Sequence, residues 1–449
     1  MIKTTRKDSW LERILLWSVV LITLYIPFHA FFSVSLGVVS HYPLFFKSWK
    51  EGALIIVAVI ATVLLFRQPE ARRFFLRSLV NQLALAFVLL HGVTAVFLHG
   101  SLLSTLAGLA IDTRYALFFL VVRASVMIVP RTKAYMIKAF GVGATVVVGF
   151  GVLQQYVLPA DILSAVGYSK ATIAPYLTVD NNPAFIRINS TLRGPNPLGA
   201  YVMAVILVII EWTAHRWKSM PAWQIGLKIV AALAALSVLY ASYSRSAWIG
   251  LAIGGIIIGL LSLPRQWLRP ALMVLLVIVA AAGVGYGALK DTSFVRTVVV
   301  HNDPATANEV DSNLGHLTSV EQASRVVMTL PLGAGVGSTG SASLLGSAPL
   351  IVENQYLFVA HEVGWIGLII FGALLFVVQR DLLRARSDWL ARAWFAAGVG
   401  LLVIGLLLPV FVDDTVAYLW WGLAAAGSAR LKCSQVKHKE SQSIFIPLK

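Results

Sequence analysis

The chain has 449 residues, of which 58% are hydrophobic and 12% are charged, and its mean hydropathy is +0.80. A soluble globular protein is about 45–50% apolar and about 25% charged, so this composition excludes a water-soluble enzyme, a disordered chain and a collagenous or disulfide-stapled protein. Because one span needs about 20 apolar residues, the composition predicts an all-α polytopic membrane protein with about twelve transmembrane helices.

Hydropathy along the chain predicts where these spans lie. They cover residues 14–36, 52–66, 79–98, 103–129, 135–158, 196–213, 225–241, 246–263, 270–288, 356–379, 393–411 and 413–428. The first apolar segment has no small-residue cleavage site, so we interpret it as a retained helix. Two long loops separate three groups of spans, which predicts the segments 1–158, 159–195, 196–288, 289–355 and 356–449. Loops of this length are usually functional or disordered.

The net charge of +16 is spread over several short loops. Basic clusters lie within residues 3–13, 67–77, 131–138, 216–228, 265–269, 380–392 and 430–449. All of them fall on one side of the twelve-span arrangement, which supports the span count and predicts that both termini lie in the cytoplasm. The same spread argues against nucleic acid as a partner, since no single basic patch forms. One cysteine, Cys433, excludes an internal disulfide.

Eleven basic residues lie outside these clusters and are the informative ones. They are Lys47, Lys50, Arg114, Arg123, Lys170, Arg187, Arg193, Arg245, Lys290, Arg296 and Arg325. Arg114 and Arg123 fall inside a span, and the others lie on or near the outer face, where the positive-inside bias disfavours them. Each therefore needs an anionic partner, from the protein or from a ligand.

Three of these arginines lie close to predicted helix ends on the outer face. Arg187 and Arg193 precede a helix for which Asn196 is the predicted N-cap and Pro197 the first helical residue. Arg245 lies in the short hairpin between the seventh and eighth spans. Guanidinium groups beside a helix N-terminus bind anions, so the three predict a phosphate or pyrophosphate site. Contact with lipid headgroups is the alternative.

The second long loop contains two recognisable segments. Residues 331–340 have the spacing GxGxxG, but no strand–helix unit surrounds it, so we interpret Gly335 and Gly337 as a turn that brings backbone close to a ligand or another helix. Residues 316–330 have helical periodicity and predict an amphipathic helix. Its apolar face would contain Leu317, Val320, Ala323, Val327 and Leu330.

Acidic residues on the outer face do not have the pattern of a metal site. They are Asp291, Asp303, Glu309, Asp311, Asp413 and Asp414. No DxD triplet occurs among them, and the pair Asp413-Asp414 is typical of a helix N-terminus. We therefore expect no metal and no cofactor.

The start of the tenth span contains the candidate general base. Glu353 and Asn354 lie at its outer mouth, and His361 and Glu362 follow about two turns deeper. Ionisable groups inside a membrane are costly and indicate function, unless neighbouring helices satisfy them. A carboxylate at a half-wet, half-apolar mouth suits a general base, and His316 in the preceding loop is the other candidate.

Taken in order, four segments resemble the O-antigen ligase and polymerase superfamily of bacterial inner-membrane glycosyltransferases. The segments are Arg193 with the run Gly-Pro-Asn-Pro-Leu-Gly to Gly199, Ser244 to Trp248, Pro331 to Gly340 and Asn354 to Gly367. The likeness covers roughly residues 180–380, including the long loop ahead of the tenth span.

The resemblance implies a GT-C-like fold with its site at the periplasmic face. A ligase of this kind moves O-antigen from undecaprenyl diphosphate to a sugar hydroxyl of lipid A-core, in lipopolysaccharide biosynthesis. It implies inversion at the anomeric carbon without metal or nucleotide sugar. The expected partners are the lipid-linked glycan, the lipid A-core acceptor and membrane lipids.

One position departs from the family pattern. Many ligases have His-Asn or His-Ser followed nine residues later by Gly-x-x-Gly, and here Glu353 occupies the histidine position ahead of Asn354, Gly364 and Gly367. Either Glu353 takes the role of that histidine or His316 supplies it from the loop, and the alignment favours Glu353. Arg187, Arg193 and Arg245 would bind the diphosphate. Asn196, Asn354, His361, Gly335 and Gly337 would support the site.

Two other classes of function remain open. The same chemistry would serve an O-antigen polymerase or a protein O-oligosaccharyltransferase, because acceptor choice depends on pocket shape. A polytopic transporter fits less well, because the chain shows no repeat of one half in the other.

Overall fold

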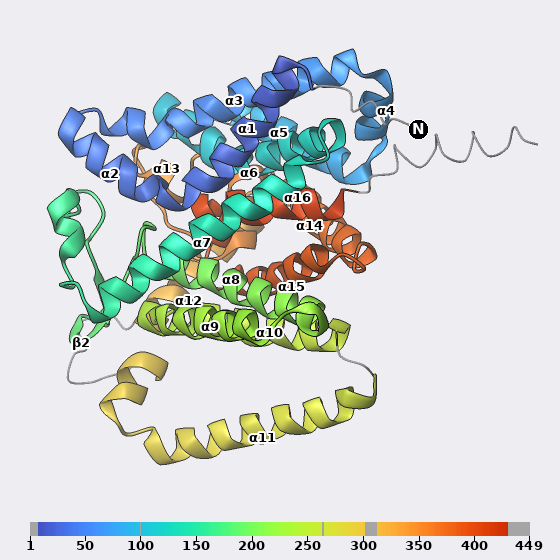
Figure 1. Ribbon diagram of the computed structural model, residues 1–449. Helices are drawn as coiled ribbons and strands as arrows, with labels where there is room; N and C mark the ends of the chain where they lie inside the picture. The colour runs from blue at the N-terminus through green and yellow to red at the C-terminus, as the bar shows by residue number, and fades with distance from the viewer. Residues whose placement is uncertain (1–7, 99, 263–264, 301–311, 430–449) are drawn as a thin grey trace, which may run out of the picture.

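The computed structural model describes residues 8–98, 100–262, 265–300 and 312–429. These residues form sixteen α-helices, short turns of other helix types and one two-stranded hairpin (Figure 1), which confirms the all-α class. The helices are α1 Trp10–Tyr25, α2 His29–Ser40, α3 Pro43–Arg67, α4 Pro69–Arg77, α5 Leu79–Phe97, α6 Leu102–Ile128, α7 Thr132–Tyr156, α8 Pro195–Arg216, α9 Ala222–Ser242, α10 Arg245–Ser262, α11 Arg265–Leu289, α12 Ser312–Thr329, α13 Gly340–Ser343, α14 Gln355–Arg384, α15 Trp389–Ile404 and α16 Asp414–Ser428.

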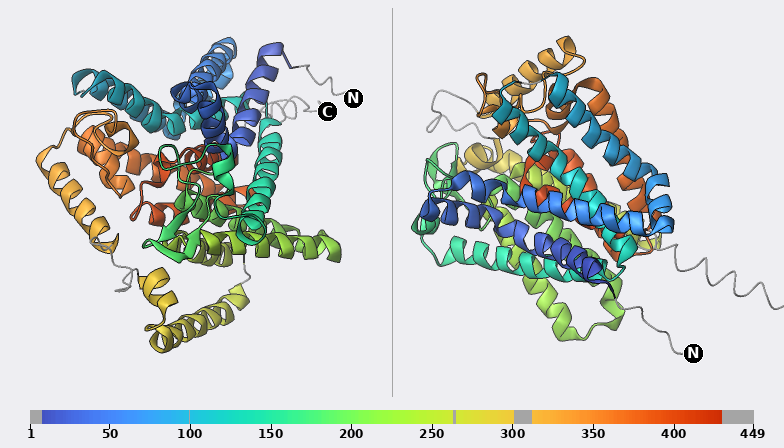
Figure 2. Two further views of the ribbon diagram at one scale, coloured as in Figure 1. Left: turned by 90° about the vertical axis from the view of Figure 1, so that its left-hand side faces the viewer. Right: turned by 90° about the horizontal axis from the view of Figure 1, so that it is seen from above.

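Within the described residues, nine helical segments are long and apolar enough to cross a membrane. They correspond to the first eight predicted spans and the tenth. The other three predicted spans correspond to α11, α15 and α16. Helix α11 lies at the periphery, on the side of α9 and α10 (Figures 1 and 2).

Two predicted spans differ from the observed helices near the N-terminus. The first is broken into α1 and α2 by a short 3-10 turn, Ile26–Phe28, because Pro27 has no N–H to continue the α-helical ladder. The second begins at Pro43, nine residues earlier than the predicted 52, so α3 includes Lys50 and Glu51. The hydropathy pattern placed the start of the predicted span after these charged residues. Because Lys50 and Glu51 form an ion pair at 2.9 Å, the helix can include them.

The core of the bundle centres on α16, which is buried along its length and packs against α6 and α15. Its sequence is rich in aromatic and small residues, which allow close helix packing. The indole N–H groups of Trp394 and Trp420 each donate to the other residue's backbone carbonyl, at 2.9 and 3.2 Å. This exchange satisfies both buried indoles and joins α15 to α16.

Polar contacts join the helix ends at the two extremities of the bundle. At the end with the basic clusters, called here the basic end, Lys133 pairs with Asp388, and Arg392 pairs with Glu211 at 2.6 Å. The opposite extremity, called here the loop end, contains the two long loops. Which end faces the cytoplasm stays a prediction from the charge pattern.

The amphipathic helix predicted in the second long loop is confirmed as α12. It packs on α14 through the buried Ala323 and Val327, and the Trp365 indole donates to the Val327 carbonyl at 2.8 Å. Leu317 and Leu330, at the ends of the predicted apolar face, are exposed.

The first long loop contains a hairpin of β1 Leu177–Val179 and β2 Asn182–Arg187. The two residues between the strands, Asp180 and Asn181, both have positive φ, at 46° and 58°. Such residues suit the tight turn that matches the twist of paired strands. Just beyond β2, the Ile188 amide donates to the Ala241 carbonyl at 3.2 Å, which fixes the end of β2 over the end of α9.

Candidate functional site

Two helix N-termini meet at the loop end, where α8 and α10 begin. A Cβ placed on Gly199 would lie 2.7 Å from Ser244 Cβ and 2.9 Å from Ala247 Cβ, so the first turns of the two helices are in direct contact. Helix N-termini present unpaired N–H groups and the positive end of the helix dipole. The positive ends of the α8 and α10 dipoles therefore lie at this junction, next to the C-terminus of α9.

The hairpin brings Arg187 to this junction. Its Nε donates to the Ser242 carbonyl at 2.9 Å and its Nη2 donates to Asn196 Oδ1 at 2.7 Å. Burial lowers the pKa of Arg187 to about 10, and the nearby charge of Arg245 adds to this effect against the opposing charge of Asp180. Arg245 therefore lies near enough for its charge to act on Arg187, and its own guanidinium donates to the Val299 carbonyl at 3.0 Å. The groups that Arg187 hydrogen-bonds are neutral.

The predicted helix start at this junction is wrong by two residues. The N-cap is Gly194, with Pro195 in the first turn, instead of Asn196 followed by Pro197. The Asn196 amide oxygen accepts from the Arg187 guanidinium, so it does not cap the helix backbone. Proline suits the first turn because its missing N–H would have no partner there.

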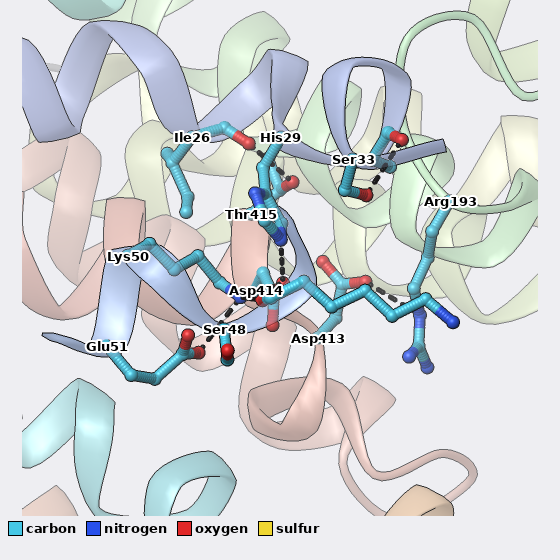
Figure 3. Close-up of polar contacts among 12 residues, drawn as sticks. Ile26, His29, Ser33, Ser48, Lys50, Glu51, Arg193, Asp413, Asp414 and Thr415 are labelled. Carbon is cyan, nitrogen blue, oxygen red and sulfur yellow. Dashed lines mark hydrogen bonds and ion pairs between the residues drawn. The ribbon is translucent and has the colours of Figure 1, made fainter. Parts of the chain in front are cut away.

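Arg193 lies in a different set of contacts. Its Nε is 3.3 Å from Asp413 Oδ2 (Figure 3). Its side chain is 48% exposed. Asp413 is the N-cap of α16 and accepts from the Val416 amide at 3.2 Å. This confirms the interpretation of Asp413 and Asp414 as a helix N-terminus.

Behind Arg193, an ion-pair network links α2, α3, α6 and α16. Asp414 contacts Lys50 at 3.2 Å and His29 at 3.5 Å (Figure 3). It also pairs with Arg114. Glu51 pairs with Lys50 at 2.9 Å and with Arg114 at 3.1 Å. Lys50 and Arg114 therefore find their anionic partners within the protein.

The sequence alone does not reveal this network. It showed that Lys50 and Arg114 need anions, but Glu51 and Asp414 come from elements far apart in the chain. The cost of burying a charge in a membrane was the one available signal. In the parts of the chain that the structure describes, no group of three or more His, Cys, Asp or Glu side chains could hold a metal ion.

The mouth of α14 holds Asn354 and Glu353. Asn354 Oδ1 accepts from the amides of Tyr356 and Leu357 at 2.9 and 3.0 Å, so Asn354 is the N-cap of α14. Glu353 is half-buried just before this cap. Its amide donates to Ser319 Oγ at 3.2 Å, which ties the mouth to α12.

The second candidate base, His316, belongs to α12, the helix that contacts the segment containing Glu353. His316 precedes Ser319 by three residues in this helix, about one turn, so the fold brings the backbones of His316 and Glu353 to the same region. The side chain of His316 lies outside what the structure describes. The choice between Glu353 and His316 stays a prediction.

Residues 331–340, called here the glycine loop, pack into a kink of α14. The kink lies at Val363 and Gly364, and Gly364 has a φ of 71°. At the kink, the His361 carbonyl accepts a hydrogen bond from the Ala334 amide of the glycine loop at 2.7 Å. The Glu362 carbonyl accepts one from the Gly335 amide at 3.2 Å. The loop therefore replaces the backbone bonds that the kink removes from the helix.

Glycines allow this close fit of the loop. Gly335 and Gly337 have φ of 101° and 80°, and a Cβ on Gly337 would lie 2.1 Å from the Ser104 carbonyl oxygen of α6. The interpretation of Gly335 and Gly337 as a turn that approaches another helix is confirmed as geometry. His361 is held by the same loop, since its Nδ1 lies 3.0 Å from Ser338 Oγ.

Comparison with known protein families found a match for part of the chain. Residues 229–372 match the family model described as O-antigen ligase, and a search of curated proteins found no match. The matched region runs from α9 to the middle of α14 and includes Arg245, His316, Glu353 and His361. The match gives residues 229–372 an O-antigen ligase domain, which supports membership in the O-antigen ligase superfamily and indicates a membrane enzyme of the glycosyltransferase type.

Proposed function

We propose that the protein is an O-antigen ligase that transfers a glycan from undecaprenyl diphosphate to a sugar hydroxyl of lipid A-core. The observation that supports this most is the position of Arg187, which bonds Asn196 in the first turn of α8 and is close enough to Arg245, the first residue of α10, to be affected by its charge. A diphosphate leaving group needs stabilisation of its negative charge, and paired guanidinium groups with helix N-termini supply it.

The reaction is a single displacement at the anomeric carbon. The acceptor hydroxyl oxygen forms the new bond to that carbon as the bond to the diphosphate oxygen breaks, and the electron pair leaves with the diphosphate. The hydroxyl proton passes to Glu353, or to His316 in the alternative assignment. Attack from the face opposite the leaving group inverts the anomeric carbon.

The contacts of Arg187 prepare it to bind an anion. Asn196 and the Ser242 carbonyl hold its guanidinium without neutralising it. A group held in place by neutral partners keeps its charge for the ligand and loses little conformational freedom on binding. Arg193, which is half exposed and paired with Asp413, lies closer to solvent and would contact the donor at the rim of the site.

The lipid part of the donor would occupy a lateral groove of about 580 Å³ between α1, α3 and α7. Its lining is apolar and includes Leu21, Phe28 and Val146. Thr191 donates to the Pro27 carbonyl at 2.9 Å, so the segment leading to Arg193 lies next to Phe28 at one end of this groove. A polyprenyl chain in the groove would therefore have its diphosphate near the loop end.

This function requires that the loop end face the periplasm and the basic end the cytoplasm, in the bacterial inner membrane. The basic clusters support that orientation through the positive-inside rule. Both substrates are then lipid-anchored in the leaflet that the loop end meets.

The direct test is transfer by the purified protein in liposomes that contain lipid-linked O-antigen and lipid A-core. Glycan-bearing lipid A-core is expected from wild type, and Arg187→Ala and Arg245→Ala should each lose most of it at normal protein levels. Arg325→Ala is the matched control, because Arg325 is exposed on α12 and pairs with Glu321 one turn away. Full activity in both arginine variants would end the proposal.

A strain that lacks the gene separates the related functions. Loss of long glycan from lipid A-core is the expected result. In that strain, single-repeat glycan on the core would instead identify a polymerase, and loss of glycan from proteins would identify a protein O-oligosaccharyltransferase. A transporter is tested separately with the purified protein in liposomes, where movement of lipid without glycan transfer would identify it.

A further inference from the structure

Two carboxyl groups face each other in the interior, away from the arginine junction. Asp112 of α6 and Glu362 of α14 line the same pocket, with their side chains within hydrogen-bonding reach of each other, and the two residues are only 4% and 1% exposed. Asp112 Oδ2 and Glu362 Oε2 are both buried without any N–H or O–H donor from the protein. A contact between two carboxyl oxygens is stable only when one of them holds a proton.

Glu362 is also the side chain that anchors the glycine loop. The amides of Gly337 and Thr339 donate to its carboxyl group, the second at 3.3 Å through Oε1. The same loop satisfies the backbone carbonyls at the kink of α14. Glu362 therefore connects the glycine loop to α6 through Asp112.

The other titratable and charged groups around the pair do not supply the missing donor. His91 of α5 uses its Nδ1 for the Phe87 carbonyl at 2.8 Å. Arg114 is engaged by Glu51 and Asp414 in the network described above. Tyr115 also lines this tight pocket, and its ring stacks on Trp421.

We propose that Asp112 and Glu362 bind one proton between them, and that this shared proton fastens the glycine loop and the kinked α14 to α6. If the proposed function holds, the two are positioning residues, because the segment of α14 that they hold begins at the cap Asn354 beside Glu353. With both carboxyl groups ionised, like charges would face each other in an apolar interior and push α6 and α14 apart.

The sign of the pH dependence follows from proton counting. Above the ordinary titration range of a carboxyl group, the unfolded chain has released both protons while the folded chain keeps one. Each pH unit should then multiply the unfolding equilibrium constant about tenfold. In Glu362→Gln or Asp112→Asn an amide N–H takes the place of the proton, so this part of the dependence should vanish.

The experiment uses the full chain in detergent micelles, with unfolding followed from about pH 6 to about pH 9. Wild type should lose stability relative to both amide variants as pH rises. Its infrared spectrum at pH 8 should contain the C=O band of a protonated carboxyl group, and Glu362→Gln and Asp112→Asn should each lack that band. Glu211→Gln is the control, because the buried Glu211 is ion-paired with Arg392 and should leave the band unchanged.

Equal pH dependence in wild type and both amide variants, or a wild-type spectrum without the band, would overturn the shared proton. Either variant alone suffices if the other does not fold. Neither measurement uses a substrate, so its result does not depend on whether the protein is a transferase. A failure of the proposed function would appear only in the transfer assay. For transfer itself, the amide variants should keep the wild-type rate near neutral pH and lose its decline at alkaline pH, whereas Glu362→Ala should be slow throughout.

Discussion

Arg187 and Asn196 lie nine residues apart, and the guanidinium of Arg187 donates to the Asn196 amide oxygen at 2.7 Å. This bond joins the end of β2 to the first turn of α8 and aims a charged group at the junction with α10. It also explains why a residue that looks like a helix cap is not one.

Replacing Asn196 should weaken donor binding in a graded way. Asn196→Ala removes a hydrogen bond to a charged group, worth about 1.5–3 kcal/mol, so the KM for the lipid-linked donor should rise about tenfold or more. Asn196→Asp should be worse, because its carboxylate would neutralise Arg187 in place of the diphosphate. Initial rates against donor concentration measure both.

The control for that series is Asn182→Ala, at the tip of the same hairpin, where the side chain bonds the Ala184 amide at 2.9 Å. It should leave the KM unchanged. An Asn196→Asp variant with normal donor binding would show that Arg187 does not meet the diphosphate.

The base is identified by comparing Glu353→Gln with His316→Ala. Loss of a general base lowers kcat by about 100- to 10,000-fold, and we expect this for Glu353→Gln with little change in donor KM. His316→Ala should keep most of the activity. The reverse result would assign the proton to His316, and near-normal kcat in both would exclude the two residues together.

The ion-pair network should contribute mainly to stability. Asp414→Asn leaves Lys50 and Arg114 with less negative charge nearby, and breaking such a buried pair costs about 3–5 kcal/mol of unfolding free energy. Thermal unfolding in detergent measures the loss, and adding Lys50→Met should recover part of it. Glu321→Gln removes the exposed pair with Arg325 and should change stability by less than about 1 kcal/mol.

Gly337→Ala tests the fit of the glycine loop against α6. Its positive φ and the 2.1 Å approach to the Ser104 carbonyl together predict a loss of about 3 kcal/mol in unfolding free energy. Gly226→Ala in α9 has open space around the new methyl group and should be neutral or slightly stabilising. Equal unfolding midpoints for the two variants would contradict the packing described here.

Filling the lateral groove should affect the donor's chain more than its head group. Val146→Trp narrows the groove and should raise the KM for donors with a long polyprenyl chain, while short-chain donors are affected little. Val96→Trp on α5 is the control, because Val96 is 67% exposed and lies outside the groove lining. The same KM change for short and long chains would place the polyprenyl chain elsewhere.

Much of the architecture could be predicted from the chain alone. Apolar runs of span length located nine membrane-crossing segments within the described residues, and periodicity located α12. These signals are local, since each depends on neighbours within a few helical turns. The same locality explains two errors. Charged residues lowered the hydropathy of the first turns of α3, so its start was predicted too late, and Pro27 broke the first predicted span into α1 and α2.

The sequence by itself determined the all-α membrane class, the order of the spans and the demand that Arg114, Arg187 and Lys50 find partners. It could not name those partners. Only the tertiary structure decided that Arg114 and Lys50 pair with Asp414, that Arg187 lies near enough to Arg245 to be affected by its charge, and that Asp112 faces Glu362. The physical reason is that the free-energy cost of burying a charge can be recognised from a single residue in the sequence. The opposite charge that offsets this cost depends on which distant helices pack together.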